Sequence, residues 1–293
     1  MILLAAVILL TVVLAVDFVS VETRAKKRFI SYKARSETIL TSYGKIAYID
    51  EGEGVPVLVC HGICGGYDQG FDVLGDKTGL FRVIAPSRFG YPGSDMPENA
   101  DIDMQAEALV ELLDQLGIDR LYVLATSAGG TAAIRFAIVH PERCSGLILY
   151  CSGYPELTKP VKEASYAGPP AFFCNDLCMW MISPLFEPLM GMERDTVNTI
   201  LPMKDRKEGI VFDGRITNTD KTNNYENYDM RALKCPVLII HSRDDKLADF
   251  ESAKAWSGIL KDCTFLPFSG GGHLMEGHEE EIENALKEFT GVR

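Results

Sequence analysis

Short, continuously apolar segments alternate with helical segments along most of this chain, and this alternation limits its possible folds more than any other feature. Residues 55–62, VPVLVCHG, form an apolar run that ends at a glycine, as expected for a strand buried on both faces. Similar runs occupy residues 81–90, 120–126, 145–153, 235–242 and 263–272. Helices are predicted at residues 101–116 and 279–290. The alternation predicts an α/β fold with a mostly parallel central sheet flanked by helices.

Length and composition restrict the class of partner. A chain of 293 residues with 47% hydrophobic content can bury a large core. Its formal net charge of −12 leaves no broad basic surface for a phosphate backbone, which argues against nucleic-acid binding. We therefore expect a small-molecule partner.

The first 28 residues read as a targeting or anchoring segment outside the fold. They carry no charge until Asp17 and become basic from Arg24. A membrane anchor helix is favoured, and a cleaved signal peptide, which implies secretion, and a buried core helix are the alternatives. Because the basic residues follow the apolar run, the positive-inside rule places the catalytic part in the cytoplasm.

Residues 153–233 interrupt the strand and helix alternation. They are rich in proline, contain the apolar sequence FFCNDLCMWMISPLFEPLMGM, and lie between two buried strands. We expect a helical cap (lid) inserted into a core formed by residues 29–152 and 234–293. Phe172, Trp180 and Met181 are predicted to line a substrate pocket beneath this cap, although such residues equally often form the cap's own core.

Residues 125–129, ATSAG, lie between an apolar strand and a helix. A serine among very small residues at such a turn is typical of the nucleophile elbow, G-x-S-x-G, in which Ser127 is the nucleophile. Ala125 replaces the first glycine and adds only one methyl group. The alternative is that the Ser127 side chain caps the helix that follows.

A serine nucleophile needs a histidine to remove its proton and a carboxylate to orient that histidine. His273 is favoured over the other four histidines because it lies in a glycine-rich loop after the final strand. Asp245 follows the preceding strand and is favoured as the acid over Asp244 and Asp249. These three groups occur in the order expected for a strand-based elbow, serine, acid and histidine.

The oxyanion formed during acyl transfer requires backbone N–H donors. Ala128, directly after the nucleophile, is one candidate, and Ile63 in the glycine-rich loop at residues 61–70 is the other. That loop has neither a Walker lysine nor a dinucleotide-binding glycine pattern, which argues against a nucleotide. The spacing of the eight cysteines does not match a metal site. We therefore expect no metal and no cofactor.

The sequences HGICGG, SRFGYPGSD, ATSAGG, HPERCSGLILY, HSRDDKL and GGHLMEGHEEEI occur in this order. With them the chain resembles the α/β-hydrolase superfamily, in particular its lid-bearing esterases and C–C bond hydrolases. The resemblance implies that Ser127 is the nucleophile, Asp245 the acid and His273 the base, with Ile63 and Ala128 as oxyanion donors. Members that open epoxides or displace halide use an aspartate at the elbow, so the serine argues against those reactions.

We therefore expect a membrane-tethered, carboxylesterase-like serine hydrolase that cleaves an ester with a hydrophobic acyl group through an acyl-enzyme. Three alternatives remain open. The same triad also serves C–C bond hydrolysis, it also serves acyl transfer or perhydrolysis, and a catalytically silent member of the fold can act as a ligand-binding protein.

Overall fold

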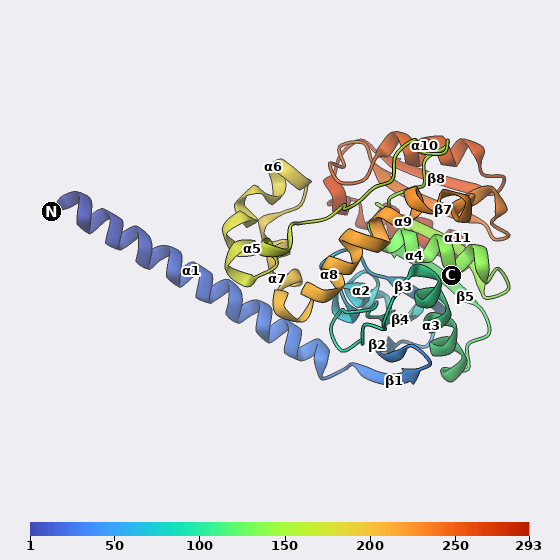
Figure 1. Cartoon of the computed structure of the whole chain (residues 1–293), viewed down its shortest axis with the longest axis horizontal. Coiled ribbons are helices and arrows are strands. Elements are labelled where there is room, and N and C mark those ends of the chain that lie inside the picture. The colour runs from blue at the N-terminus through green and yellow to red at the C-terminus, as the bar shows by residue number, and fades with distance from the viewer. Residues whose placement is uncertain (293) are drawn as a thin grey trace.

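A single sheet of eight strands forms the centre of the molecule, in the order β1-β2-β4-β3-β5-β6-β7-β8 (Figure 1). The computed structural model describes residues 1–292. The pairs β1–β2 and β2–β4 are antiparallel, and all other neighbours are parallel. The strands are β1 (Glu37–Thr41), β2 (Gly44–Glu51), β3 (Val55–Cys60), β4 (Phe81–Pro86), β5 (Leu121–Thr126), β6 (Cys144–Tyr150), β7 (Val237–Ser242) and β8 (Cys263–Phe268). The prediction of a mostly parallel sheet is confirmed.

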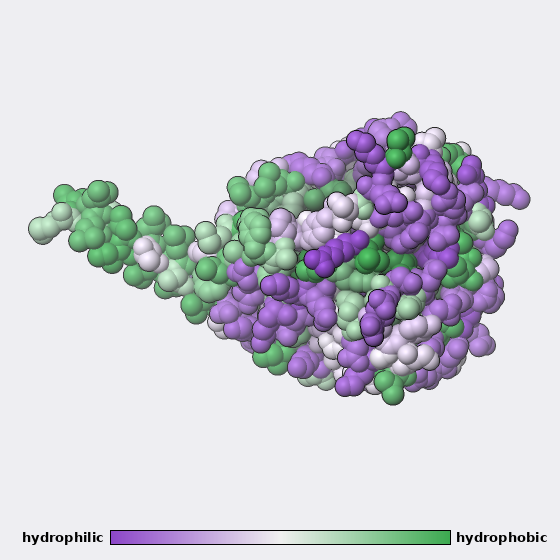
Figure 2. All heavy atoms as spheres, in the orientation of Figure 1, coloured by the Kyte–Doolittle hydropathy of each residue, from purple (hydrophilic) through white to green (hydrophobic). Residues whose placement is uncertain are grey.

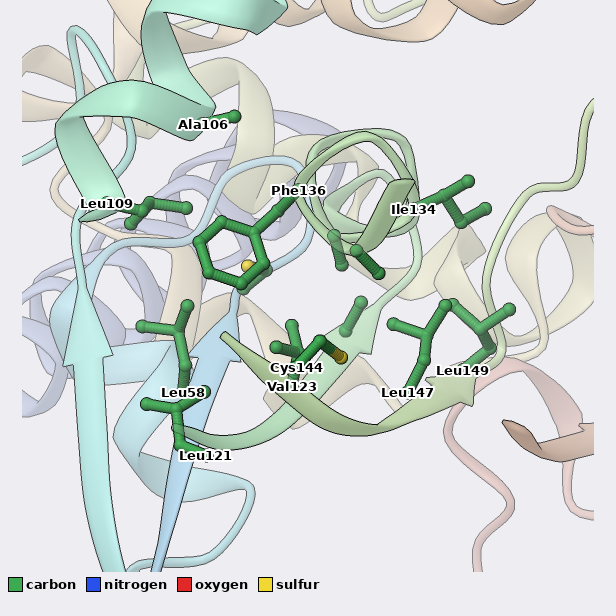
Figure 3. Packing of buried hydrophobic residues seen from close by; sticks show 14 of the residues in the cluster. Leu58, Ala106, Leu109, Leu121, Val123, Ile134, Phe136, Cys144, Leu147 and Leu149 are labelled. Atoms are coloured by element: carbon green, nitrogen blue, oxygen red, sulfur yellow. The ribbon is translucent and has the colours of Figure 1, made fainter. Parts of the chain in front are cut away.

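Helices cover both faces of the sheet. Those of the core are α2 (Tyr67–Asp72), α3 (Ile102–Gln115), α4 (Gly129–Val139), α10 (Phe250–Ile259) and α11 (Glu279–Thr290). The helices α3, α4 and α10 bury apolar side chains against one face, while α2, α11 and the end of α1 (Ile2–Lys33) cover the other. In Figure 3, Leu109 and Phe136 extend from α3 and α4 toward Val123 of β5. This two-sided burial explains the continuous apolar runs of the parallel strands.

The segment between β6 and β7 is built from short helices. They are α5 (Asp176–Ile182), α6 (Phe186–Met190), α7 (Val197–Ile200), α8 (Lys207–Phe212) and α9 (Asn218–Asn223), with 3-10 turns and one π-helical turn between them. We call residues 153–233 the cap. Figure 1 shows that α5 and α7 lie beside α1 and that α8 and α9 lead back toward the sheet.

Helix α1 combines two chemically different halves. The whole helix is long and apolar enough to cross a membrane by length and composition, and none of its most apolar stretch, which lies toward the N-terminus, is buried in the protein. A buried core helix is therefore not what the structure contains. The C-terminal half packs on α7, α5 and α2, and it buries Val21, Ala25 and Phe29. The N-terminal part of α1 therefore extends away from the folded domain, while its C-terminal half packs against that domain.

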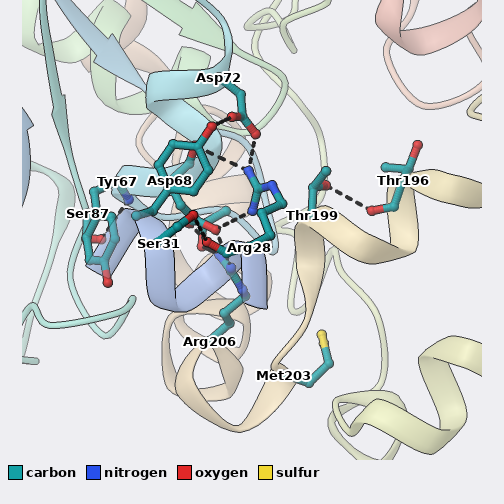
Figure 4. Close-up of polar contacts among 12 residues, drawn as sticks. Arg28, Ser31, Tyr67, Asp68, Asp72, Ser87, Thr196, Thr199, Met203 and Arg206 are labelled. Carbon is teal, nitrogen blue, oxygen red and sulfur yellow. Dashed lines mark hydrogen bonds and ion pairs between the residues drawn. The ribbon is translucent and has the colours of Figure 1, made fainter. Parts of the chain in front are cut away.

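Two buried ion-pair clusters fasten the cap to the core. Arg88, which follows β4, binds Asp213 of the cap with an Nη2 to Oδ2 distance of 2.7 Å. In the second cluster, Asp68 of α2 accepts hydrogen bonds from Arg206 of the cap and from Arg28 of α1 (Figure 4). Asp68 and Arg206 are fully buried. One carboxylate thereby joins the core, the cap and the N-terminal helix.

Loss of the buried Arg88–Asp213 ion pair should destabilise the protein far more than loss of an ion pair on the surface. The Asp213→Asn variant leaves the Arg88 charge without its partner, so we expect the free energy of unfolding to fall by about 3–5 kcal/mol. Urea denaturation of the full-length protein in detergent micelles measures this change. The matched control is Glu226→Gln, which removes an ion pair with Lys159 whose side chains are 65–67% exposed. Equal effects of the two variants would show that the Arg88–Asp213 pair does not fasten the cap.

Candidate functional site

Ser127 occupies a sharp turn between β5 and α4. Its φ angle is +49°, in the left-handed region that side chains rarely adopt and that costs on the order of 1–2 kcal/mol. The N-cap of α4 is Ala128, and no side chain caps this helix. Within residues 1–292 the Ser127 hydroxyl makes no hydrogen bond to the protein. Ser127 is therefore not a helix N-cap, and its hydroxyl group is free to act as a nucleophile.

Close backbone packing explains why the turn is built from small residues. A Cβ atom on Gly129 would lie 2.2 Å from the carbonyl oxygen of Cys60, so the first turn of α4 rests directly on the end of β3. A Cβ on Gly62 would lie 3.2 Å from Cβ of Ser127, which places the loop after β3 against the turn. Ala125 is fully buried, and its methyl group fits where the motif more often has glycine.

The structure joins His273 to Asp245. Both carboxylate oxygens of Asp245 lie 2.9 Å from Nδ1 of His273. Since an ionised carboxylate only accepts hydrogen bonds, Nδ1 carries the proton and donates it, which leaves Nε2 as the basic atom. Asp245 also accepts hydrogen bonds from the backbone N–H groups of Leu247 and Ala248. The imidazole is thus held by a carboxylate that is itself fixed.

The other two candidate acids perform different tasks. Asp244 accepts a hydrogen bond from Ser242 at 2.5 Å and another from the backbone N–H of Gly272 at 2.9 Å, so it fixes the loop that carries His273. Asp249 caps α10 through the backbone N–H of Ser252. Among the three acids, the imidazole of His273 contacts Asp245.

His273 lies on the loop after β8, whereas Ser127 follows β5, and β6 and β7 lie between these two strands in the sheet. In residues 1–292 no hydrogen bond joins these two side chains, and His273 instead contacts the thiol of Cys151 at the end of β6. The strands β5 and β6 are paired up to Thr126 and Tyr150, and the backbone N–H of Ser127 donates to the Tyr150 oxygen. Adjacent strands are about 4.8 Å apart. A catalytic serine–histidine hydrogen bond often forms fully only when substrate binds, so its absence here does not by itself exclude the triad.

The two predicted oxyanion donors remain unoccupied by protein acceptors. In the described part of the chain, the backbone N–H groups of Ile63 and Ala128 donate to no backbone or side-chain oxygen. The glycine-rich loop that carries Ile63 packs against the Ser127 turn, as the position of Gly62 shows. Both donors therefore lie on segments that border the nucleophile.

Arg88 is a site residue to which the sequence analysis assigned no role. It is 2% exposed, and its guanidinium donates hydrogen bonds to the carbonyl oxygens of His61 and Gly62. Its backbone N–H donates to Nε2 of His61 at 3.0 Å. Arg88 therefore holds the loop that presents Ile63. The sequence does contain a signal for this role: Arg88 is a charged residue within the apolar segment of residues 81–90, and a buried charge requires a buried partner.

Two of the three predicted pocket residues of the cap are largely exposed. Phe172 and Met181 are 68% and 62% exposed. The indole nitrogen of Trp180 donates a hydrogen bond to Asp17 of α1. Trp180 and Met181 instead border a cleft between the cap and α1, together with Val13. The contact between Trp180 and Asp17 could not be predicted from the local sequence of the cap, because the two residues are 163 positions apart in the chain.

The electrostatics of the pair suit a general base. Burial disfavours the charge on Asp245, but hydrogen bonds with His241 and His273 outweigh this cost and hold the pKa of Asp245 well below its ordinary value. Burial also lowers the pKa of His273, yet contact with Cys151 and the bond to Asp245 raise it above its ordinary value of 6.5. The carboxylate therefore stays charged, and the imidazole is more basic than a free histidine.

Comparisons with known proteins agree with this geometry. The family model described as alpha/beta hydrolase fold matches residues 55–174. An uncharacterised hydrolase of Bacillus subtilis, YcgS, is 28% identical over 276 residues, which cover 86% of this chain and 96% of that protein. This chain belongs to the α/β-hydrolase superfamily.

Two further similarities are to proteins whose names describe an activity. A 2-hydroxy-6-oxononadienedioate/2-hydroxy-6-oxononatrienedioate hydrolase of Paraburkholderia phymatum is 26% identical over 269 residues, which cover 84% of this chain and 91% of that protein. A solved structure, described as a membrane phospholipase A and a novel bacterial virulence factor, superposes with a TM-score of 0.63 at 19% identity. The superposition covers 99% of this chain and 98% of that one, so it includes the N-terminal helix.

The contact between His273 and Cys151 predicts a pH effect. His273 must be neutral to accept a proton, so its raised pKa should place the rising limb of kcat/KM above pH 6.5. In the Cys151→Ala variant one influence that raises this pKa is gone, and the limb should move to lower pH. A pH–rate profile for ester hydrolysis measures the shift. The matched control is Cys263→Ala in β8, for which we expect no shift, and an unmoved limb in Cys151→Ala would refute the assignment.

Proposed function

We propose that this protein is a membrane-anchored serine hydrolase that cleaves a carboxylic ester with a hydrophobic acyl group. The observation that carries this proposal is the hydrogen-bonded pair of Asp245 and His273 at the sheet edge where Ser127 forms a strained, uncapped turn. A buried histidine held by a carboxylate, at the same sheet edge as an unbonded serine hydroxyl, supports activation of the serine for acyl transfer.

The proposed mechanism follows from these positions. Nε2 of His273 takes the proton from Ser127 as Oγ attacks the ester carbonyl carbon, and Asp245 stabilises the resulting imidazolium. The backbone N–H groups of Ile63 and Ala128 bind the oxyanion of the tetrahedral intermediate, at about 3–4 kcal/mol for each donor. The imidazolium then protonates the departing alcohol, which leaves an acyl group on Ser127. Water, deprotonated by His273, hydrolyses this acyl-enzyme and restores the serine.

The N-terminal helix supports a lipophilic ester as substrate. An apolar helix with an unburied N-terminal half concentrates the site at a membrane surface, where long-chain esters partition. The likeness to the membrane phospholipase A, which extends over the N-terminal helix, supports the same choice. The basic residues that follow the apolar run favour a catalytic part on the cytoplasmic side.

C–C bond hydrolysis is the second candidate, favoured by one specific observation. The Paraburkholderia phymatum hydrolase is similar to this chain over most of both proteins, and its name describes a dienedioate substrate. The same serine, histidine and aspartate would serve that reaction, so substrate tests decide between the two.

The test is a series of p-nitrophenyl esters of increasing acyl length, hydrolysed by the full-length protein in detergent micelles. We expect kcat/KM to rise with chain length, and Ser127→Ala to lower it by about 10⁴-fold or more. Asp245→Asn should lower kcat by about 10³–10⁴-fold, because the imidazole loses its orienting charge.

The matched control for the nucleophile is Ser152→Ala. Ser152 follows the neighbouring strand β6, and its hydroxyl donates to the Ala125 carbonyl, so this variant should retain ester hydrolysis. Undiminished turnover by Ser127→Ala would overturn the proposal. Faster cleavage of a vinylogous diketone acid than of any ester would favour the second candidate, and absence of turnover on both classes would favour a ligand-binding role.

A further inference from the structure

The outer surface of the cap exposes an unusual number of large apolar side chains. Its members come from the 3-10 turns and helices between residues 171 and 190, and each is about half exposed or more. They are Phe172 (68%), Leu177 (50%), Met181 (62%), Leu185 (49%) and Leu189 (63%), which we call the cap apolar face. Figure 2 shows the apolar surface of this region continuing onto the apolar part of α1. Soluble proteins rarely expose patches of this kind without a binding partner.

The cap apolar face is held beside α1 by specific contacts. Nε1 of Trp180 donates to Oδ2 of Asp17 at 2.8 Å, and Arg194 pairs with the same carboxylate. The rings of Phe18 and Trp180 meet edge to face, with centroids 5.4 Å apart. An open cleft of about 550 Å³ lies between the cap and α1, and it is bordered by Val13, which belongs to the apolar half of the helix.

The length of the uncharged segment fixes the depth of this surface. Ile2 to Val16 are fifteen residues before the first charge, at Asp17, and they rise only about 22 Å at 1.5 Å per residue. The hydrocarbon core of a bilayer is about 30 Å thick. If α1 spans it, the hydrocarbon boundary lies at or beyond Asp17. The residues that contact Asp17, including Trp180 of the cap, then lie at this boundary.

The chemistry around Asp17 agrees with an interfacial position. Tryptophan is enriched where hydrocarbon meets headgroups, and the carboxylate of Asp17 is neutralised there by Arg194. The charged positions that follow Glu22 on α1, Arg24, Lys26 and Lys27, are basic and favour anionic headgroups. This sequence of apolar, aromatic and basic groups runs in the order of the layers of a leaflet.

We propose that the cap apolar face and the cleft beside α1 insert among the acyl chains of the leaflet from which α1 emerges. The cap is then a second membrane contact, and it places the entrance to the site against the lipid phase. The occupant is bilayer lipid rather than a second copy of the chain, because the face is continuous with a helix half that itself requires lipid. The statement that substrate enters from the bilayer rests on the proposed ester hydrolase function, whereas the docking itself does not.

The two tryptophans of the chain allow a direct test in nanodiscs made with phospholipids brominated on their acyl chains. Bromine quenches only tryptophans that reach the hydrocarbon. Trp180 lies at the proposed boundary, while Trp256 is 3% exposed within α10 and donates to the Pro155 carbonyl. We expect strong quenching in Trp256→Phe, which retains Trp180, and none in Trp180→Phe, which retains Trp256.

Charged substitutions on the cap apolar face then separate docking from anchoring. In the Trp256→Phe background, Leu185→Asp with Leu189→Asp should remove most of the quenching, while α1 keeps the protein in the nanodisc. The matched control is Leu40→Asp, a leucine on the edge strand β1 that is 71% exposed, which should leave the quenching unchanged. Thermal unfolding shows whether each variant is folded.

Persistent quenching in the double variant, or no quenching of Trp180 in the parent, would overturn the docking. A dimer that the double variant dissociates, with Trp180 unquenched throughout, would assign the face to a second copy instead. Hydrolysis of a vesicle-embedded ester should fall by about ten-fold in the double variant, while a soluble short-chain ester is unaffected. Because quenching needs no turnover, failure of the proposed function would leave the fluorescence result intact.

Discussion

The close approach of α4 to the end of β3 is the constraint on which the site depends. With Gly129 pressed on the Cys60 carbonyl, the chain can leave β5 and enter α4 only through a turn that holds Ser127 in the left-handed region. Parallel strands then bring their carboxyl ends to one edge, so the loops after β7 and β8 carry Asp245 and His273 at the same edge as that turn. The strained backbone at Ser127 and the parallel direction of β5, β7 and β8 together place the three candidate triad residues at one edge of the sheet.

The sequence allowed much of this to be predicted because the signals are local. A buried strand, a cluster of small residues and a following helix identified the Ser127 turn, and chain order favoured Asp245 and His273. The loop position of an acid did not by itself separate Asp245 from Asp244, whose carboxylate fixes the Gly272 backbone instead. Strand β1 escaped prediction because its five residues show no clear alternation of buried and exposed side chains.

Long-range pairing set the limit of prediction. The sequence around Arg88 does not indicate that its partner is Asp213, 125 residues later. Likewise, the sequence of the cap does not indicate that Trp180 binds Asp17. Such partners are chosen by the tertiary arrangement of buried charges, which must be paired wherever the fold places them. The orientation of the cap's apolar side chains could not be predicted for the same reason, because an apolar sequence does not show which surface its side chains contact.

These long-range contacts connect the N-terminal helix to both the cap and the core. Arg28 of α1 and Arg206 of the cap share Asp68, so helix, cap and core meet at one buried carboxylate. The loop that presents Ile63 is held by Arg88, which is itself paired with the cap. A change in how the cap and helix sit at a membrane is therefore linked by direct contacts to the loop that borders Ser127.

The central claim is that Ser127 is a nucleophile activated by His273. The most direct measurement is reaction of the full-length protein with a fluorophosphonate, followed by mass spectrometry of its peptides. We expect one adduct, on Ser127, and its loss in the His273→Ala variant, because the hydroxyl then has no base. An unmodified Ser127 in the folded protein, or equal labelling with and without His273, would contradict the account.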